Sequence, residues 1–107
     1  MNTRIIVNLQ YEGIHFWKDC DIPEVSYLKD PHRHIFHICC KKTVILLNRQ
    51  IEIICFKNKI LAYLEGKYYG NFRGISCEMI ANDILNEFEL DYCSVLEDGE
   101  NGAEVYK

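Results

Sequence analysis

Three of the four histidines of this chain lie within six positions, in the stretch PHRHIFH. The fourth, His15, lies upstream in YEGIHFW. Residues two apart on a β-strand share a face, so His32 and His34 point one way and His37 points the other. Imidazole nitrogens that converge at this spacing can bind one metal ion. His15 completes a set of three nitrogens if its strand pairs with that of His32 and His34, and His37 is excluded from the set.

Three histidines with one open coordination position are the ligand set of a catalytic zinc site, whereas structural zinc sites have four protein ligands. The alternative is that these histidines recur on a half-exposed strand and make polar contacts with solvent or with a ligand. An H-x-H pair on its own does not decide between these readings. Zinc is therefore the cofactor that His15, His32 and His34 predict, and its occupancy stays open.

The apolar pattern predicts the elements that must position these side chains. Apolar residues alternate with polar ones along the strands and recur every three or four residues along the helices. We expect one α+β domain over residues 1–107, with a four- to five-stranded antiparallel sheet covered on one face by two helices. The predicted strands span 4–17, 34–47, 51–56, 92–97 and 103–107, and the predicted helices span 57–65 and 77–88.

Several local signals set the ends of these elements. Gly13 predicts a bulge in the first strand, just before His15. The stretch LNRQ predicts a hairpin turn between the second and third strands. Gly66 is expected to end the first helix and Ser76 to cap the second. In the second helix, Met79 is expected to belong to the buried stripe together with the neighbouring isoleucines.

Composition limits the class of protein. A hydrophobic content of 49% with 26% charged residues indicates a globular chain, and no apolar run approaches the roughly 20 residues of a membrane span. We find no signal-peptide pattern at the start, so the six cysteines are expected to be reduced thiols and the location to be cytoplasmic. The net charge of −4 makes duplex nucleic acid an unlikely partner.

The order of motifs resembles the tunnelling-fold (T-fold) family of 6-pyruvoyl- and 6-carboxytetrahydropterin synthases. That family has an aromatic-led strand ending in a histidine, a loop, and then H-G-H followed by an aromatic residue and a β-run. Here YEGIHFW, a polar loop and HRHIFHICCKKTV stand in the same order. The resemblance implies that His15, His32 and His34 are zinc ligands, with Arg33 in place of the usual glycine.

Two later segments extend the resemblance over nearly the whole chain. The stretch ISCEMIA resembles the P-T-x-E-N-type helix start of the family, with Glu78 in register. The stretch VLEDGENGAEVY resembles the final segment, where a glutamate anchors the pterin or purine ring through its N–H edge. The resemblance therefore implies that Glu97 is the ring anchor, through a directional carboxylate contact.

The chain departs from the family where the family does its chemistry. The catalytic cysteine of the family lies a few residues before H-G-H, and the nearest cysteine here is Cys20, in the right loop at the wrong spacing. The family also uses an Asp-His pair between the helices, and no histidine follows His37 in this chain. Cys20 is the one weak catalytic candidate. Because the groups that transfer protons are missing, we expect binding more than catalysis.

Two further stretches have alternative interpretations. Phe72 and Arg73, in KYYGNFRG, could stack on a base and contact a phosphate, or their loop could pack its rings onto the sheet. The acidic stretch DGENG could bind a cation, but it is too short for an EF-hand loop and is typical of a hairpin turn.

These observations lead to three functional hypotheses. The first is a pocket that binds a purine- or pterin-like heterocycle or a nucleotide, in a homo-oligomer built through sheet edges, with an active zinc-dependent lyase as its enzymatic version. The second is a phage-encoded counter-defence protein of the host cytoplasm, which sequesters a nucleotide signal or inhibits a host protein. The third is a protein-binding module whose histidines are incidental.

Overall fold

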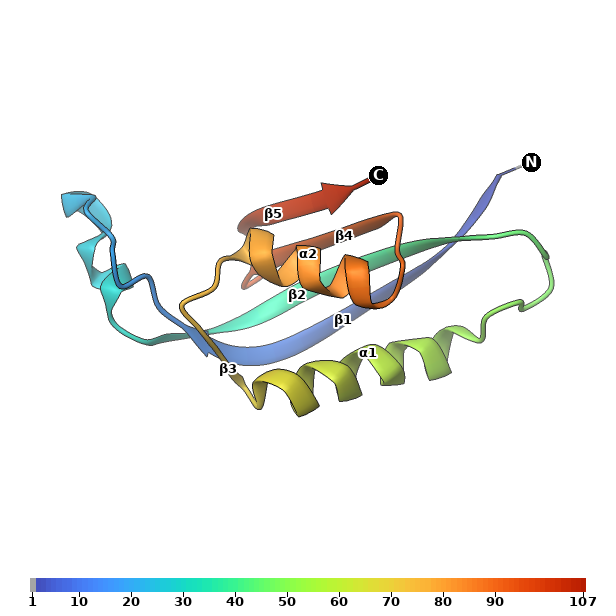
Figure 1. Cartoon of the computed structure of the whole chain (residues 1–107), viewed down its shortest axis with the longest axis horizontal. Helices are drawn as coiled ribbons and strands as arrows, with labels where there is room; N and C mark the ends of the chain where they lie inside the picture. Colours follow the sequence, from blue (N-terminus) through green and yellow to red (C-terminus); the bar gives the residue numbers. More distant parts are fainter. Residues whose placement is uncertain (1) are drawn as a thin grey trace.

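The chain folds as an α+β domain, which confirms the predicted class (Figure 1). The structure is a computed structural model that describes residues 2–107. The strands are β1 (Thr3–His15), β2 (His32–Val44), β3 (Asn71–Arg73), β4 (Tyr92–Glu97) and β5 (Asn101–Tyr106), and the helices are the 3-10 helix η1 (Pro23–Lys29), α1 (Ile53–Tyr68) and α2 (Cys77–Glu87).

The five strands form one sheet in the order β3-β1-β2-β4-β5. Strands β1 and β2 form a long antiparallel ribbon whose register runs from Thr3 opposite Val44 to His15 opposite His32. The short strand β3 pairs with β1 in parallel, so the sheet is mixed and not purely antiparallel as predicted. This parallel pairing arises because the chain returns from α1 to the same end of the sheet at which β1 finishes (Figure 1).

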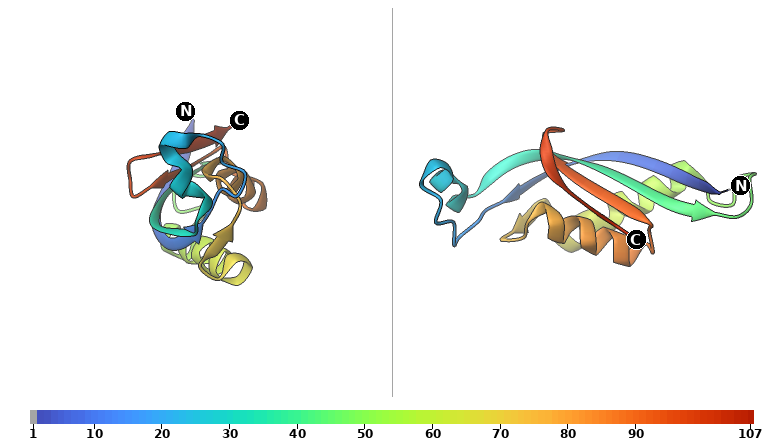
Figure 2. Two further views of the ribbon diagram at one scale, coloured as in Figure 1. Left: turned by 90° about the vertical axis from the view of Figure 1, so that its left-hand side faces the viewer. Right: turned by 90° about the horizontal axis from the view of Figure 1, so that it is seen from above.

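Helices α1 and α2 lie on one face of the sheet, as predicted (Figure 2). Their buried residues meet the inward-facing residues of the central strands, and the alternation along β1 and β2 decides which side chains enter this core. The most deeply buried of them include Leu9, Phe36, Ile38, Ile60, Leu64, Ile80, Ile84 and Val95. In the described part of the chain, no helix is long and apolar enough to cross a membrane.

The predicted strand over residues 51–56 is wrong, because α1 begins inside that segment. The Glu52 carboxylate caps the helix by accepting a hydrogen bond of 2.6 Å from the Cys55 backbone N–H. Phe56, Ile60 and Leu64 then follow at four-residue spacing, and all three are buried. This stripe favours a helix over the strand that the β-branched residues suggested.

The predicted LNRQ hairpin is also wrong. The Gln50 side chain folds back on the loop, and its Oε1 accepts from the backbone N–H groups of Ile45 at 2.7 Å and Leu46 at 2.8 Å. The chain therefore leaves the sheet and enters α1. That helix continues through Gly66, and Tyr69 caps it in the left-handed conformation with φ of 53°.

Two predictions about single residues need correction. Met79 is 56% exposed and does not belong to the buried stripe of α2. That stripe consists of Cys77, Ile80, Ala81, Ile84 and Leu85. Gly13 pairs regularly with His34 of β2, and the irregularity expected just before His15 lies instead in the pairing of β1 with β3, between Ile14 and His15. Glycine is needed at position 13 for space, since a Cβ atom would lie 2.8 Å from the Phe72 ring.

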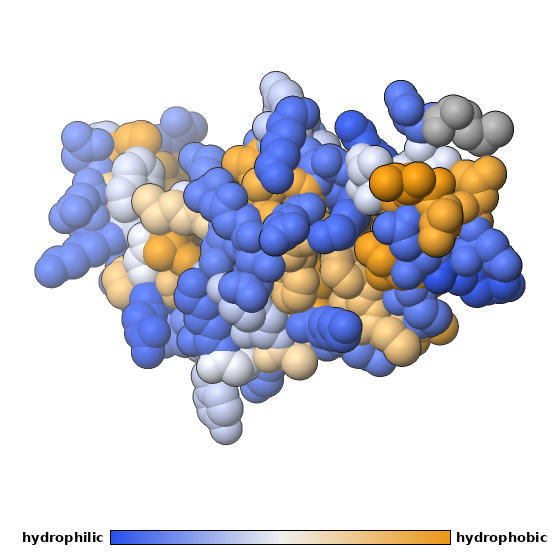
Figure 3. Space-filling model, turned by 45° about the vertical axis from the view of Figure 1, so that its right-hand side comes forward, coloured by the Kyte–Doolittle hydropathy of each residue, from blue (hydrophilic) through white to orange (hydrophobic). Residues whose placement is uncertain are grey.

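One end of the molecule exposes a group of aliphatic side chains (Figure 3). They come from the loop after β2 and from the first turn of α1, where the two elements meet. A contiguous apolar patch is a common feature of surfaces that associate with other molecules. The patch consists of Ile45, Leu46, Leu47, Ile53 and Ile54, which are 50–83% exposed.

Candidate metal centre and adjoining pocket

The register of β1 and β2 brings the three predicted histidines together. His15 lies directly opposite His32, and His34 lies one pair further along the same face. The ring centroids are 4.6 Å apart for His15 and His32, 5.3 Å for His15 and His34, and 5.0 Å for His32 and His34. His37 points to the opposite face, against Gly99, as strand alternation predicted.

Each of the three rings has an oxygen acceptor at Nδ1. Carbonyl and ionised carboxylate oxygens can only accept, so Nδ1 carries the proton in every case, and Nε2 of the neutral ring keeps its lone pair. Histidine ligands of metals show this arrangement, because the bond at one ring nitrogen fixes the tautomer and the orientation of the other. The acceptors are the Ile75 carbonyl at 3.3 Å for His15, the Asp30 carbonyl at 2.8 Å for His32, and Asp98 Oδ2 at 2.7 Å for His34.

The hairpin turn after β4 supplies one of these acceptors. The turn over DGENG joins the antiparallel strands β4 and β5, as predicted for a hairpin. It places Asp98 so that one carboxylate oxygen accepts from His34 and the other from the Ile35 backbone N–H at 3.0 Å. The bond to His34 is the main reason that the pKa of Asp98 lies below its usual value.

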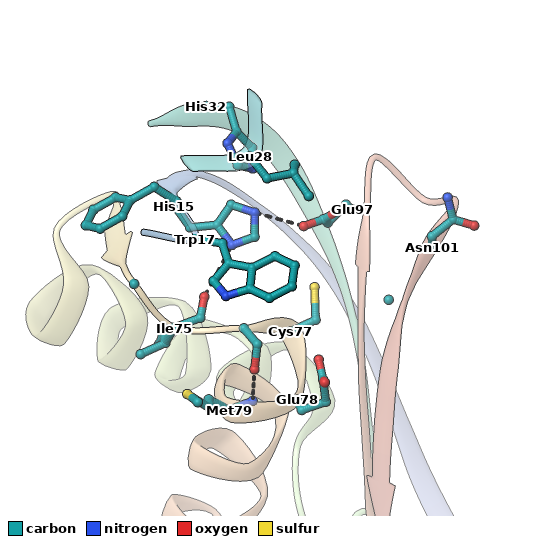
Figure 4. Close-up of a pocket in the computed structure, with 14 residues that line it drawn as sticks. His15, Trp17, Leu28, His32, Ile75, Cys77, Glu78, Met79, Glu97 and Asn101 are labelled. Carbon is teal, nitrogen blue, oxygen red and sulfur yellow. Dashed lines mark hydrogen bonds and ion pairs between the residues drawn. The ribbon is translucent and has the colours of Figure 1, made fainter. Parts of the chain in front are cut away.

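Glu97 lies against the nitrogens of this cluster. Its Oε2 is 2.8 Å from His15 Nε2 and 3.7 Å from His34 Nε2 (Figure 4). The contact with His15 is an ion pair when that ring is protonated (Figure 4), but neither buried Nε2 atom has an aligned hydrogen bond. Buried nitrogens without a partner are costly, and a cation among them would satisfy their lone pairs.

The cluster could hold a metal ion. His15, His32, His34 and Glu97 each offer one ligand atom, and these atoms all lie within 4.8 Å of one another. Imidazole nitrogens and a carboxylate oxygen are the donors that zinc accepts. The donor set and its buried, unpartnered nitrogens therefore fit a metal ion of this kind.

The pKa of His15 is lowered from its ordinary value. Burial of the ring is the largest cause, and the neighbouring His32 and His34 act in the same direction, while the Ile75 carbonyl and Glu97 oppose them. Burial thus favours the neutral imidazole, which is the form that binds a metal.

This shift predicts how the metal-free protein responds to acid. In the unfolded chain His15 takes up a proton near pH 6.5, while in the folded chain it does so only at lower pH. The free energy of unfolding of chelator-treated protein should therefore decrease as the pH falls below about 6.5. Urea unfolding between about pH 7.5 and 5 measures this. His15→Gln should weaken the dependence, and an unchanged pH dependence in that variant would contradict the assignment to His15.

A pocket adjoins the metal cluster (Figure 4). Its volume is about 470 Å³, which lies within the range of small-molecule sites. One side is formed by the end of β1 and the loop after it, and the other by the first turn of α2 and the β4–β5 hairpin. The lining side chains include Trp17, Leu28, Cys77, Glu78, Met79, Glu97 and Asn101.

Cys77 also lines this pocket, although the sequence alone did not predict it as a site residue. It is the first residue of α2, after the N-cap Ser76, and its thiol faces Glu97 (Figure 4). Burial, reinforced by the negative charge of Glu97, raises the pKa of Cys77 to about 12. The thiol is therefore protonated at neutral pH and is not a reactive thiolate. The sequence feature that could have located Cys77 in the pocket is its position next to Glu78, a predicted ligand-binding residue, in ISCEMIA.

Two of the predicted ligand contacts lie elsewhere. Phe72 is 1% exposed, and its ring packs in the core against Phe36, with centroids 4.9 Å apart. Arg73 is exposed at the end of β3 and does not line the pocket. The alternative interpretation, in which the KYYGNFRG segment packs its rings onto the sheet, describes Phe72.

Cys20 also lies away from the pocket lining. It is 2% exposed, and its thiol points at the carbonyl of Val25 at 3.6 Å, within its own loop. These contacts are those of a thiol that stabilises the loop between β1 and β2.

The geometry thus joins two features at one end of the sheet. One is a cluster of three imidazoles and a carboxylate that could hold a metal ion, and the other is a pocket with an indole, a protonated thiol and two carboxylates. His15, His32 and Glu97 belong to both, so a ligand in the pocket would lie beside an ion held by the cluster. No protein-family model matches the chain, and no curated protein matches it.

Proposed function

We propose that this protein binds zinc through His15, His32 and His34 and holds a purine- or pterin-like heterocycle or a nucleotide in the adjoining pocket. The observation that carries the proposal is the shared orientation of the three imidazoles, each with Nδ1 bonded to an oxygen. Histidine ligands of metals are characteristically held by a hydrogen bond at the ring nitrogen that does not bind the metal. A chance group of surface histidines is not expected to share this arrangement. The resemblance to the T-fold synthases points to the same three residues.

The chemistry of the pocket supports a flat heterocyclic ligand. Trp17 and Leu28 provide apolar surface on which a ring can lie, and Glu78 and Glu97 provide carboxylates. A carboxylate that faces two N–H groups of a guanidine-like ring edge makes a short and directional pair of hydrogen bonds. The amide groups at the start of α2 add a positive dipole near the same surface.

Binding without synthase chemistry is the better match to these residues. Cys20 is enclosed in its loop, and Cys77 is protonated, so neither offers a thiolate to the pocket. In this proposal the three clustered histidines bind the metal, and His37 lies on the opposite face of the sheet, away from the pocket. A reaction that moves protons needs a group with a suitable pKa within reach of the substrate.

A sequestering role is the second candidate, and the same absence of a reactive group favours it. A pocket that closes on a nucleotide and does not transform it would lower the concentration of a nucleotide signal. A counter-defence protein encoded by a phage is one setting for such a role, in the cytoplasm of the host. Homo-oligomerisation through the sheet edges at β3 and β5 is part of the proposal, because open edges pair readily.

The only tryptophan gives a direct measurement of ligand binding. Trp17 lines the pocket, so a stacked purine or pterin should quench its fluorescence. We expect saturable quenching of the zinc-loaded protein by GTP, GMP or neopterin, and loss of about 10-fold or more in affinity for Glu78→Gln. Glu100→Gln, an exposed change outside the pocket lining, is the control.

Mass spectrometry of the same mixtures separates binding from turnover. Unchanged ligand after long incubation supports the binding role, and a converted product supports the lyase. Absence of quenching with all three probes, in protein that contains zinc, would contradict the heterocycle pocket.

A further inference from the structure

Glu97 is positioned by a strand different from those that carry the histidines. It ends β4 and lies opposite Phe36 of β2, between the partners His15 and His34 on the same face. A ligand set with Glu97 would therefore connect β1, β2 and β4, the three central strands of the sheet. Among residues 2–107, Glu97 is the one carboxylate in this group of possible ligands, since Asp98 contacts the outer Nδ1 of His34.

The contacts of Glu97 are those of a co-ligand. Its Oε2 approaches His15 Nε2 to 2.8 Å and His34 Nε2 to 3.7 Å without an aligned hydrogen bond to either. Two donors that bind one tetrahedral zinc at about 2.0–2.1 Å lie roughly 3.3 Å from each other. The two distances from Glu97 Oε2, 2.8 Å and 3.7 Å, lie on either side of this ligand–ligand distance. A carboxylate that only accepted a hydrogen bond would instead lie in line with an N–H bond of one ring.

We propose that Glu97 is the fourth protein ligand of a closed three-histidine, one-glutamate centre, and that Glu78 is the carboxylate left to anchor the heterocycle. The inference rests on the proposed zinc site. It changes the role that the resemblance implies for Glu97, which there is the ring anchor. It also changes the kind of centre, because closed four-ligand zinc sites are structural and catalytic ones keep an open position.

Cys77 acts on Glu97 from the other side. The thiol is buried at the start of α2 and faces the carboxylate across the pocket (Figure 4). A metal ion and the thiol would then lie on different sides of Glu97, so the first turn of α2 would adjoin the centre. Cys77 is in this account a positioning residue, comparable to the outer partners Asp98 and Ile75 of the histidines.

Glu78 is free for the other role. It stands one residue further along α2, is exposed and lines the pocket. It is not a member of the cluster of possible metal ligands. The two carboxylates of the pocket are thus divided between the metal and the ring.

Cobalt substitution tests this assignment without any assay of activity. Four-coordinate Co²⁺ absorbs visible light strongly, and an added water or azide ligand changes the spectrum. We expect the wild-type Co²⁺ protein to show an intense spectrum that azide leaves unchanged. Glu97→Gln should lower Co²⁺ affinity by at least about 10–100-fold and make the spectrum respond to azide. Glu78→Gln should keep the wild-type spectrum and affinity and lose only heterocycle binding.

Each other outcome contradicts the inference in a distinct way. An azide response of the wild-type protein would show an open position and overturn the closed centre, and this measurement needs no variant. Wild-type Co²⁺ affinity in folded Glu97→Gln would remove Glu97 from the ligand set while the three-histidine proposal stood. If the wild-type protein bound no Co²⁺ or Zn²⁺ at all, the inference and the proposed function would fail together.

Discussion

If the protein binds zinc as proposed, we expect chelation to lower the melting temperature of the wild-type protein by about 15 °C. An ion present at about 1,000 times its dissociation constant stabilises the folded state by about 4 kcal/mol. In a domain of this size, 1 kcal/mol corresponds to about 4 °C in melting temperature. The ligands join β1, β2 and β4, so removal of the ion loosens the centre of the sheet. Differential scanning calorimetry with and without EDTA measures the effect.

Two variants test whether the stabilisation by zinc depends on the proposed histidine ligands. His34→Ala should melt at a low temperature with or without zinc, because it lacks one ligand. His37→Ala lies on the same strand but on the other face, so it should keep the full response to zinc. Equal responses in the two variants would contradict the histidine set.

We expect Phe36→Ala to destabilise the protein by about 3–5 kcal/mol and also to weaken zinc binding. Phe36 is 0% exposed and lies under the metal cluster, with its ring centroid 5.3 Å from that of His15 and 5.7 Å from that of His34. It also packs against Phe72. Loss of this ring removes core contacts and at the same time the surface that orients two ligands.

Phe56→Ala is the matched control for this prediction. Phe56 is also buried, but it lies in the first turn of α1 and packs against Phe88, away from the metal cluster. We expect a comparable loss of stability in urea unfolding with unchanged zinc affinity in the folded protein. If both variants lost zinc affinity equally, the support of the site by Phe36 would be ruled out.

The sequence predicted which histidines come together, because their geometry depends on strand period and on the pairing of two long strands. Alternation separates His37 from His32 and His34, and antiparallel pairing of the two long strands brings His15 opposite His32. The N-cap Ser76 likewise predicted where α2 begins, and the observed bond from Met79 N–H to Ser76 Oγ is 3.2 Å long. These features rest on local rules that hold in any tertiary context.

The features that the sequence did not reveal depend on tertiary contacts. Residues 51–56 are rich in isoleucine, yet a side-chain cap at Glu52 and a buried stripe further along make them a loop and a helix. Phe72 is aromatic in a glycine-rich segment, and only the parallel pairing of β3 with β1 brings it into the core. Cys77 enters the pocket because α2 packs with its first turn against the end of β4. Short motifs do not encode such packing.

Native mass spectrometry of the freshly purified protein tests the central claim most directly. We predict about one zinc ion per chain in the wild-type protein and in His37→Ala, and none in His34→Ala. Wild-type protein that takes up no zinc, even when the ion is added in excess, would contradict the account, as would equal zinc content in His34→Ala and His37→Ala.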